Sequence, residues 1–182
     1  MTLSPRLRKV ALTTHIISSV GWLGAVAASL ALAITTLTAG DPQTIRGAHI
    51  ALELIAWSVL VPLSVASLLS GIVQSLGTKW GLMRHYWVVI KLAITVLATV
   101  VLLLYTQTLG NGSDAARRTA ARPDLDPLLQ SPSPVLHATV ALLLLLGATV
   151  LAVFKPAGIT RYGRRRMQLS RDAARTTPAR SR

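Results

Sequence analysis

The main feature of the sequence is the alternation of long apolar stretches with shorter polar segments. Four stretches are almost continuously apolar, at residues of about 10–37, 47–76, 86–107 and 135–154. A helix needs roughly 20 residues to cross the hydrocarbon core of a bilayer, whereas the strands of a membrane barrel alternate apolar and polar side chains over about ten. The pattern therefore predicts an all-α, polytopic membrane protein, folded as an antiparallel four-transmembrane-helix bundle.

The polar segments divide the rest of the chain. Residues 108–134 are rich in Pro, Asp, Arg, Ser and Gly and have no apolar periodicity, which predicts an irregular connection that acts as a mobile spacer. Residues 156–182 are polar and basic and are expected to form a disordered tail, so the transmembrane domain would cover residues 1–155. Pro62, near the middle of the second stretch, removes a backbone hydrogen bond and predicts a distortion of that helix.

Composition and charge narrow the class further. The 182-residue chain carries a net charge of +13, yet only 14% of its residues are charged, 52% are hydrophobic and the mean hydropathy is +0.54. This combination is typical of apolar spans with basic ends and not of a soluble nucleic-acid-binding protein, so no nucleic-acid partner is expected. The chain has no cysteine, which excludes disulfides and Cys-ligated zinc or iron–sulfur sites.

The positions of Lys and Arg predict the orientation in the membrane. These residues gather before the first stretch, between the second and third, and after the fourth. The positive-inside rule then places both termini in the cytoplasm and the protein in the inner (plasma) membrane. The basic tail is expected mainly to signal this orientation, with anionic lipid headgroups as its partners.

A few ionisable side chains interrupt the apolar stretches, and each is a candidate site residue because charge inside a bilayer is costly. They form two layers. His15 and Lys91 each lie about five residues inside the first and third stretches from the cytoplasmic side, about 8 Å deep. His49 and Glu53 share one face of the second stretch, and His137 lies near the level of His49 in the fourth. In an up-down bundle the first and third stretches are diagonal partners, as are the second and fourth.

The outer layer predicts a cofactor site. Paired imidazoles from two membrane helices are a common way to hold haem b, and His49 and His137 are a candidate pair. Arg46, three residues before His49, is then the expected partner of a haem propionate. Alternatively, His49, Glu53 and His137 would bind a divalent metal ion, since imidazole and carboxylate groups suit zinc, iron or copper.

The inner layer offers a second haem site and has simpler interpretations as well. His15 is a candidate iron ligand, with Lys91 or His85 as the second ligand or as the partner of a propionate. In the simpler interpretations, these imidazoles are hydrogen-bonded interface residues with no cofactor bound, and Lys91 extends to the membrane surface. Glu53 would be satisfied by a hydrogen bond to His49 without any metal.

Two local patterns resemble a known group of bacterial membrane proteins. The first stretch has His15, then Trp22 seven residues later and Gly24, and the third has Trp87 followed by Lys91 at the fourth position. Spacings of seven and four each put both residues on one helix face. The chain resembles the uncharacterised small four-helix integral membrane proteins of bacteria, of an actinobacterial type by its Ala, Leu and Arg bias. It is distantly similar to HemJ-type protoporphyrinogen oxidases and CopD-like copper-resistance proteins.

The resemblance carries functional implications. Similarity to the HemJ-type proteins implies haem b binding and a redox role, with His15 and Lys91 at the functional positions, whereas similarity to the CopD-like proteins implies copper handling. The first expectation is therefore a haem b-binding redox or electron-transfer protein. Two alternatives stay open. One is a small ion- or metal-handling transporter, and the other is a non-catalytic subunit whose strips of small residues recruit a membrane partner or a second copy.

Overall fold

The structure, a computed structural model, describes residues 4–77, 86–122, 124–154 and 158, and all of its regular structure in these ranges is helical. The elements are α1 (Pro5–Thr38), α2 (Pro42–Ile55), the π-helical η1 (Ala56–Leu60), α3 (Val61–Gly77), α4 (Tyr86–Arg118), the 3-10 helix η2 (Pro127–Gln130) and α5 (Ser133–Phe154). Because α2, η1 and α3 follow one another without a break, they form one long helix. Within the described ranges, four helical segments are long and apolar enough, by length and composition, to cross a membrane, as the sequence predicts for a multi-pass membrane protein.

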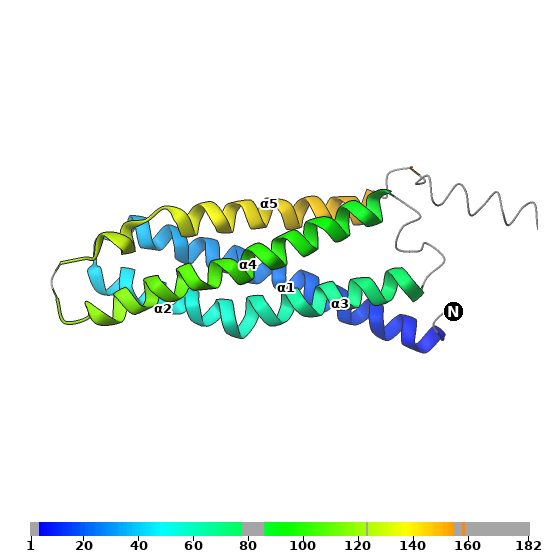
Figure 1. Cartoon of the computed structure of the whole chain (residues 1–182), viewed down its shortest axis with the longest axis horizontal. Helices are drawn as coiled ribbons and strands as arrows, with labels where there is room; N and C mark the ends of the chain where they lie inside the picture. Colours follow the sequence, from blue (N-terminus) through cyan, green and yellow to red (C-terminus); the bar gives the residue numbers. More distant parts are fainter. Residues whose placement is uncertain (1–3, 78–85, 123, 155–157, 159–182) are drawn as a thin grey trace, which may run out of the picture.

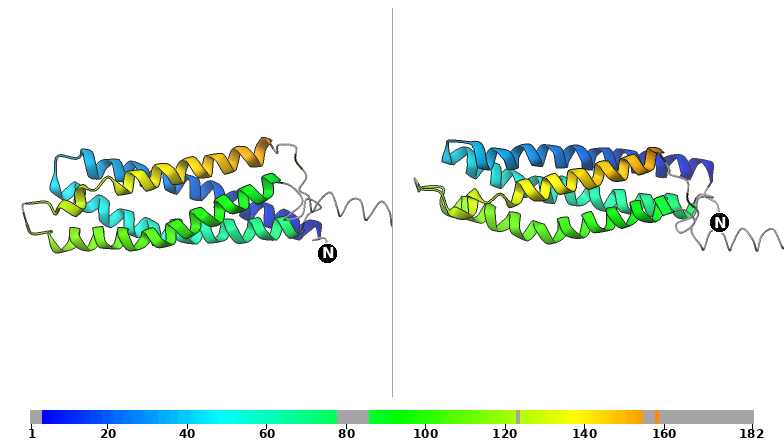
Figure 2. Two further views of the ribbon diagram at one scale, coloured as in Figure 1. Left: turned by 45° about the horizontal axis from the view of Figure 1, so that its top comes forward. Right: turned by 90° about the horizontal axis from the view of Figure 1, so that it is seen from above.

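The long helices form a bundle whose successive members run in opposite directions (Figure 1). We call the end that holds the start of α1 the terminal end, and the end that holds the α1–α2 and α4–α5 connections the loop end. The first helix, α1, packs against α2, α3 and α5, and α4 packs against the same three. The further views show the same arrangement (Figure 2). Consequently α1 and α4 are diagonal across the bundle, as the sequence predicts for the first and third apolar stretches.

The first two long helices begin earlier than the apolar pattern predicts. Ser4 caps α1 by accepting a hydrogen bond from the Leu7 backbone N–H (3.4 Å), and Asp41 caps α2 by accepting one from the Thr44 N–H (2.9 Å). The Thr44 hydroxyl also donates to the Asp41 carboxylate (2.9 Å). The hydrogen bonds from the Thr44 N–H and hydroxyl hold the pKa of the Asp41 carboxyl below its ordinary value. A capping side chain satisfies an otherwise unpaired N–H, so each helix extends beyond its apolar part into polar sequence.

The distortion expected near Pro62 takes the form of the π-helical segment η1. The Val61 N–H bonds to the carbonyl of Ala56, five residues earlier, rather than to the carbonyl four residues earlier. Pro62 follows at once and has no N–H to continue the regular ladder. The distortion lies mid-bundle, where Leu60 faces the interior.

The prediction of an irregular spacer over residues 108–134 is wrong for its first part, because α4 continues to Arg118. Gly110 and Gly112, taken from sequence as loop signals, lie inside this helix where α4 packs on α2. A Cβ at Gly112 would stand 2.8 Å from Nδ1 of His49, and one at Gly110 would stand 3.6 Å from Glu53 Oε1. The glycines therefore serve close helix packing, which outweighs their poor helix propensity. The 3-10 helix η2 and the carbonyls bound by α2 order much of the remainder.

The interior of the bundle contains many small and hydroxyl-bearing side chains beside larger ones such as Trp22 and Leu60, while many large apolar side chains face outward. Ser64 and Ser67 are buried, and Ser64 donates to the Val61 carbonyl of its own helix. A Cβ at Gly21 would meet Leu63 at 3.2 Å, so α1 and α3 approach closely there. This arrangement suits helices surrounded by lipid, where packing of small residues rather than water exclusion drives association. The predicted tail at residues 156–182 lies outside the described residues except for Gly158, and His85 also lies outside them.

Candidate functional site

The centre of the candidate site is a hydrogen bond between His15 and Lys91, which reach each other across the diagonal of the bundle. Lys91 Nζ lies 3.1 Å from His15 Nε2. Both side chains are half-buried, on α1 and α4 toward the terminal end. The sequence prediction that the two residues lie at one level is therefore confirmed, and the structure adds that they touch.

The other ring nitrogen of His15 fixes the protonation of the imidazole. His15 Nδ1 lies 3.1 Å from the Ser67 carbonyl oxygen and 3.1 Å from the Ser70 hydroxyl oxygen. A carbonyl only accepts hydrogen bonds, so Nδ1 carries the proton and donates it. Nε2 is then left with the lone pair, and Lys91 donates to it. Gly71 makes room for the ring, because a Cβ there would lie 3.2 Å from His15 Cε1.

No carboxylate among the described residues forms an ion pair with Lys91. The ion pair that the structure shows joins Arg117 to Glu53 at 3.2 Å, toward the loop end. The side-chain partner of Lys91 that the structure shows is the His15 imidazole, which carries no negative charge. A cation in that position favours an anionic group of a ligand as its counter-charge.

At the loop end, Arg46 and His49 hold the connection between α4 and α5. Arg46 is 3% exposed and donates from Nη2 to the carbonyls of Arg122 and Asp124, both at 2.9 Å. Its Nε donates to the Thr119 hydroxyl at 3.4 Å. His49 is equally buried, and its Nε2 donates to the Leu129 carbonyl at 3.0 Å. Both side chains are thus engaged in the packing of this connection.

Substitution of Arg46 by methionine should loosen that connection. Each lost hydrogen bond to a charged group contributes roughly 1.5–3 kcal/mol, so tryptic cleavage after Arg118 should speed up at least about ten-fold. Limited proteolysis with mass spectrometry measures the rate. Glu53→Gln is the matched control, since its exposed ion pair with Arg117 contributes little. Equal cleavage of wild type and Arg46→Met would contradict the assigned role.

His137 occupies different surroundings. Its Nδ1 donates to the Ser133 carbonyl at 2.9 Å, one turn earlier on α5. Its ring stacks on Tyr105 of α4, with centroids 3.9 Å apart and an interplanar angle of 12°. Tyr105 in turn shares a hydrogen bond with the Ser133 hydroxyl at 3.2 Å. By the same argument as for His15, Nδ1 carries the proton and Nε2 of His137 keeps the lone pair.

The structure does not bring the predicted outer-layer residues together. His49 faces Gly112 and Leu129, Glu53 pairs with Arg117, and His137 stacks on Tyr105. No three His, Asp or Glu side chains of the described chain form a group that could hold a metal ion, so the metal site predicted at His49, Glu53 and His137 is not formed. Arg46 is already bound to two carbonyls. The paired-imidazole haem site with Arg46 on a propionate therefore finds no support in this geometry.

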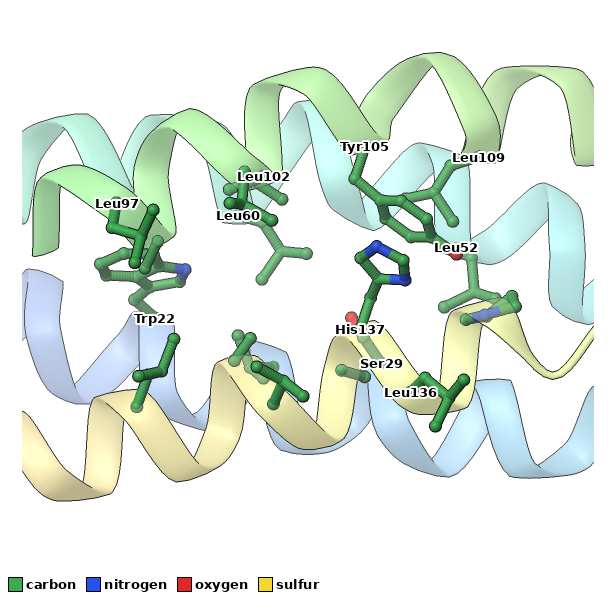
Figure 3. Close-up of a pocket in the computed structure, with 18 residues that line it drawn as sticks. Trp22, Ser29, Leu52, Leu60, Leu97, Leu102, Tyr105, Leu109, Leu136 and His137 are labelled. Carbon is green, nitrogen blue, oxygen red and sulfur yellow. The ribbon is translucent and has the colours of Figure 1, made fainter. Parts of the chain in front are cut away.

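A cavity of about 350 Å³ lies between α1, α4 and α5, with Leu52 of α2 and Leu60 of η1 also in its wall, beside the stacked Tyr105 and His137 (Figure 3). Its wall is mostly Leu, Val and Ala, and Trp22 of α1 lies toward its terminal end. Sequence reasoning missed this cavity and the part played by Tyr105, because cavity-lining leucines on a membrane helix look the same as lipid-facing ones. The signal in the sequence was the hydroxyl-bearing Tyr105 within the apolar third stretch.

Comparisons of the chain with protein-family models, curated proteins and solved structures found no match. The resemblance to HemJ-type and CopD-like proteins stays a prediction.

Proposed function

We propose that the protein is a haem b-binding membrane protein with a redox or electron-transfer role, in which His15 is an iron ligand. The observation that carries the proposal is the 3.1 Å hydrogen bond from His15 Nδ1 to the Ser67 carbonyl. This bond fixes the ring orientation and leaves Nε2 with the lone pair that a metal requires, as is usual for metal-ligating histidines. The resemblance to HemJ-type proteins points to the same residue.

The donor groups at this end of the bundle fit haem in part. His15 would supply an iron ligand through Nε2, and the Lys91 ammonium group would pair with a propionate. In the structure, Lys91 Nζ donates a hydrogen bond to Nε2 of His15. Iron ligation by Nε2 therefore requires this hydrogen bond to break. When bound, haem supplies a one-electron couple, and the protein's part is to orient the imidazole through Ser67 and Ser70.

The proposal includes an orientation. Arg6, Arg8 and Lys9 lie in the first turns of α1 at the terminal end. Under the positive-inside rule this end faces the cytoplasm, which places both termini there and the His15–Lys91 pair in the cytoplasmic half of the plasma membrane. Electrons would then be exchanged near the inner surface.

The experiment is an absorption spectrum of protein purified from haem-replete cells, before and after addition of hemin. A Soret band that shifts on reduction supports the proposal, and a colourless protein unchanged by hemin overturns it. Cysteine scanning with a membrane-impermeant reagent, at Ser4 and at Gly40, tests the orientation separately.

A second candidate function is proton handling at the same pair, and the direct hydrogen bond from Lys91 to His15 favours it. Two nitrogen bases 3.1 Å apart can pass one proton between them. Protein that stays colourless but carries protons across vesicle membranes, and loses this on Lys91→Leu, would replace the haem proposal by this one.

A further inference from the structure

The cavity beside Tyr105 and His137 is separate from the His15–Lys91 pair. On α1 it extends from Trp22 to Ser29, seven residues or about 10 Å along the axis, and Trp22 is itself about 10 Å from His15. Within the described chain, neither His15 nor Lys91 lines it. A ligand in this cavity would therefore be a second occupant of the bundle, independent of the proposed haem.

Two polar groups without partners face the space from opposite ends. Trp22 is 2% exposed, and its indole N–H has no hydrogen-bond partner among the described residues. Figure 3 shows this indole nitrogen turned into the open space between the helices, with His137 and Tyr105 toward the other end. Every fully buried polar side-chain atom among the described residues has a hydrogen-bond partner, so this indole nitrogen is instead reached from the cavity and can donate to a ligand acceptor.

His137 supplies the complementary group. Its Nδ1–H is used by the Ser133 carbonyl, and its Nε2 makes no hydrogen bond within the described chain. The tautomer therefore presents an acceptor, and the stack on Tyr105 holds the ring in place. A matching ligand has a hydrogen-bond acceptor at one end and a donor at the other.

The residues that line the cavity indicate from which side a ligand enters it. Leu97 and Val101 of α4 and Leu136 and Val140 of α5 line the cavity and are also exposed on the outside of the bundle, at 54%, 42%, 61% and 55%. In a membrane this outer face meets acyl chains, so the cavity opens sideways to lipid. The ligand is consequently lipid-soluble.

We propose that this cavity binds a lipid-soluble molecule of the quinol type. A para-quinol carries a hydroxyl group at each end of a flat apolar ring, so one hydroxyl donates to His137 Nε2 while the other accepts from Trp22 Nε1. An acyl chain, with a single polar end, leaves one of these two groups unpaired. The cavity volume lies within the range of small-molecule sites, and the apolar walls suit a ring with a short prenyl chain.

The test compares two probes, 2-methyl-3-prenyl-1,4-naphthoquinol kept anaerobically reduced, and its dimethyl ether. The ether keeps both acceptor oxygens and lacks both donors. Calorimetry on the full-length protein in detergent should give about five-fold tighter binding of the quinol to wild type, the contribution of one neutral hydrogen bond. In His137→Phe, which keeps an aromatic ring against Tyr105, this preference should vanish while the ether binds as before.

Two further variants separate loss of the site from loss of the fold. Ala138→Leu fills the cavity and should abolish binding of both probes, whereas Ala93→Leu, on an exposed part of α4 outside the cavity, should leave both affinities unchanged. Trp22→Phe should weaken both probes equally, since each accepts from the indole. Equal affinity of wild type for quinol and ether, survival of the preference in His137→Phe, or equally tight binding of palmitate would each overturn the proposal.

Discussion

Replacing His15 by alanine is expected to abolish the Soret band of haem-loaded protein. The imidazole is held by the Ser67 carbonyl and the Ser70 hydroxyl, and it is the side-chain partner that the structure shows for Lys91. Losing the His15 imidazole should reduce haem affinity by two orders of magnitude or more, since even residues that only hydrogen-bond to a metal ligand affect affinity by about 10–100-fold. Hemin titration followed at the Soret maximum measures this loss.

The matched controls are His49→Gln and His137→Gln. His49 is committed to the Leu129 carbonyl and His137 to the Ser133 carbonyl, and glutamine can donate a hydrogen bond in each place. Both variants should keep the Soret band with unchanged hemin affinity. If the Soret band disappears in these two variants and persists in His15→Ala, haem is bound by His49 and His137, and the assignment to His15 is refuted.

A separate prediction concerns Lys91. Lys91→Leu removes the donor that takes the lone pair of His15 Nε2, and it also removes the cation available to a propionate. If Lys91 serves a propionate, the variant should bind hemin with the same Soret maximum and at most about five- to ten-fold lower affinity, because it loses one charge-assisted hydrogen bond but no longer has to free Nε2 of His15. A displaced Soret maximum would instead identify Lys91 as the second iron ligand.

The sequence was sufficient for the four helices and for the level of His15 and Lys91. Hydropathy over about 20 residues predicts a span, and the 1.5 Å rise per residue converts sequence position into depth. The up-down topology makes the first and third spans diagonal, which is where α1 and α4 lie. Depth and topology together predicted that His15 and Lys91 lie at one level on diagonal helices, and the structure adds the hydrogen bond between them.

The loop end could not be predicted, because there the outcome depends on how each helix is rotated about its axis. His49 and His137 lie near one level on α2 and α5, yet His49 turns to Gly112 and η2 while His137 turns to Tyr105. The position of a residue along the bundle axis does not show which face of its helix meets the neighbouring helix. The glycines of residues 108–118 misled the prediction for a related reason, since a loop signal and a close helix contact use the same residue.

Gly112→Ala is expected to destabilise the protein despite the better helix propensity of alanine. The added Cβ would lie 2.8 Å from His49 Nδ1, well inside contact distance. The ring cannot swing away freely, because its Nε2 is bound to the Leu129 carbonyl and the side chain is 3% exposed. Overpacking of this kind costs about 1–3 kcal/mol. The thermal midpoint of the purified protein in detergent should therefore fall.

Gly24→Ala on α1 is the matched control for this effect. Both glycines lie inside long helices, but a Cβ at Gly24 would meet nothing within 4 Å. The control variant should therefore gain about 0.5–1 kcal/mol from the propensity difference alone, and its thermal midpoint should rise slightly. Opposite signs at the two positions would show that Gly112 is required by the contact with His49. If both midpoints rose, α2 and α4 would not approach as closely as this contact requires, and the role of His49 in holding η2 would have to be abandoned.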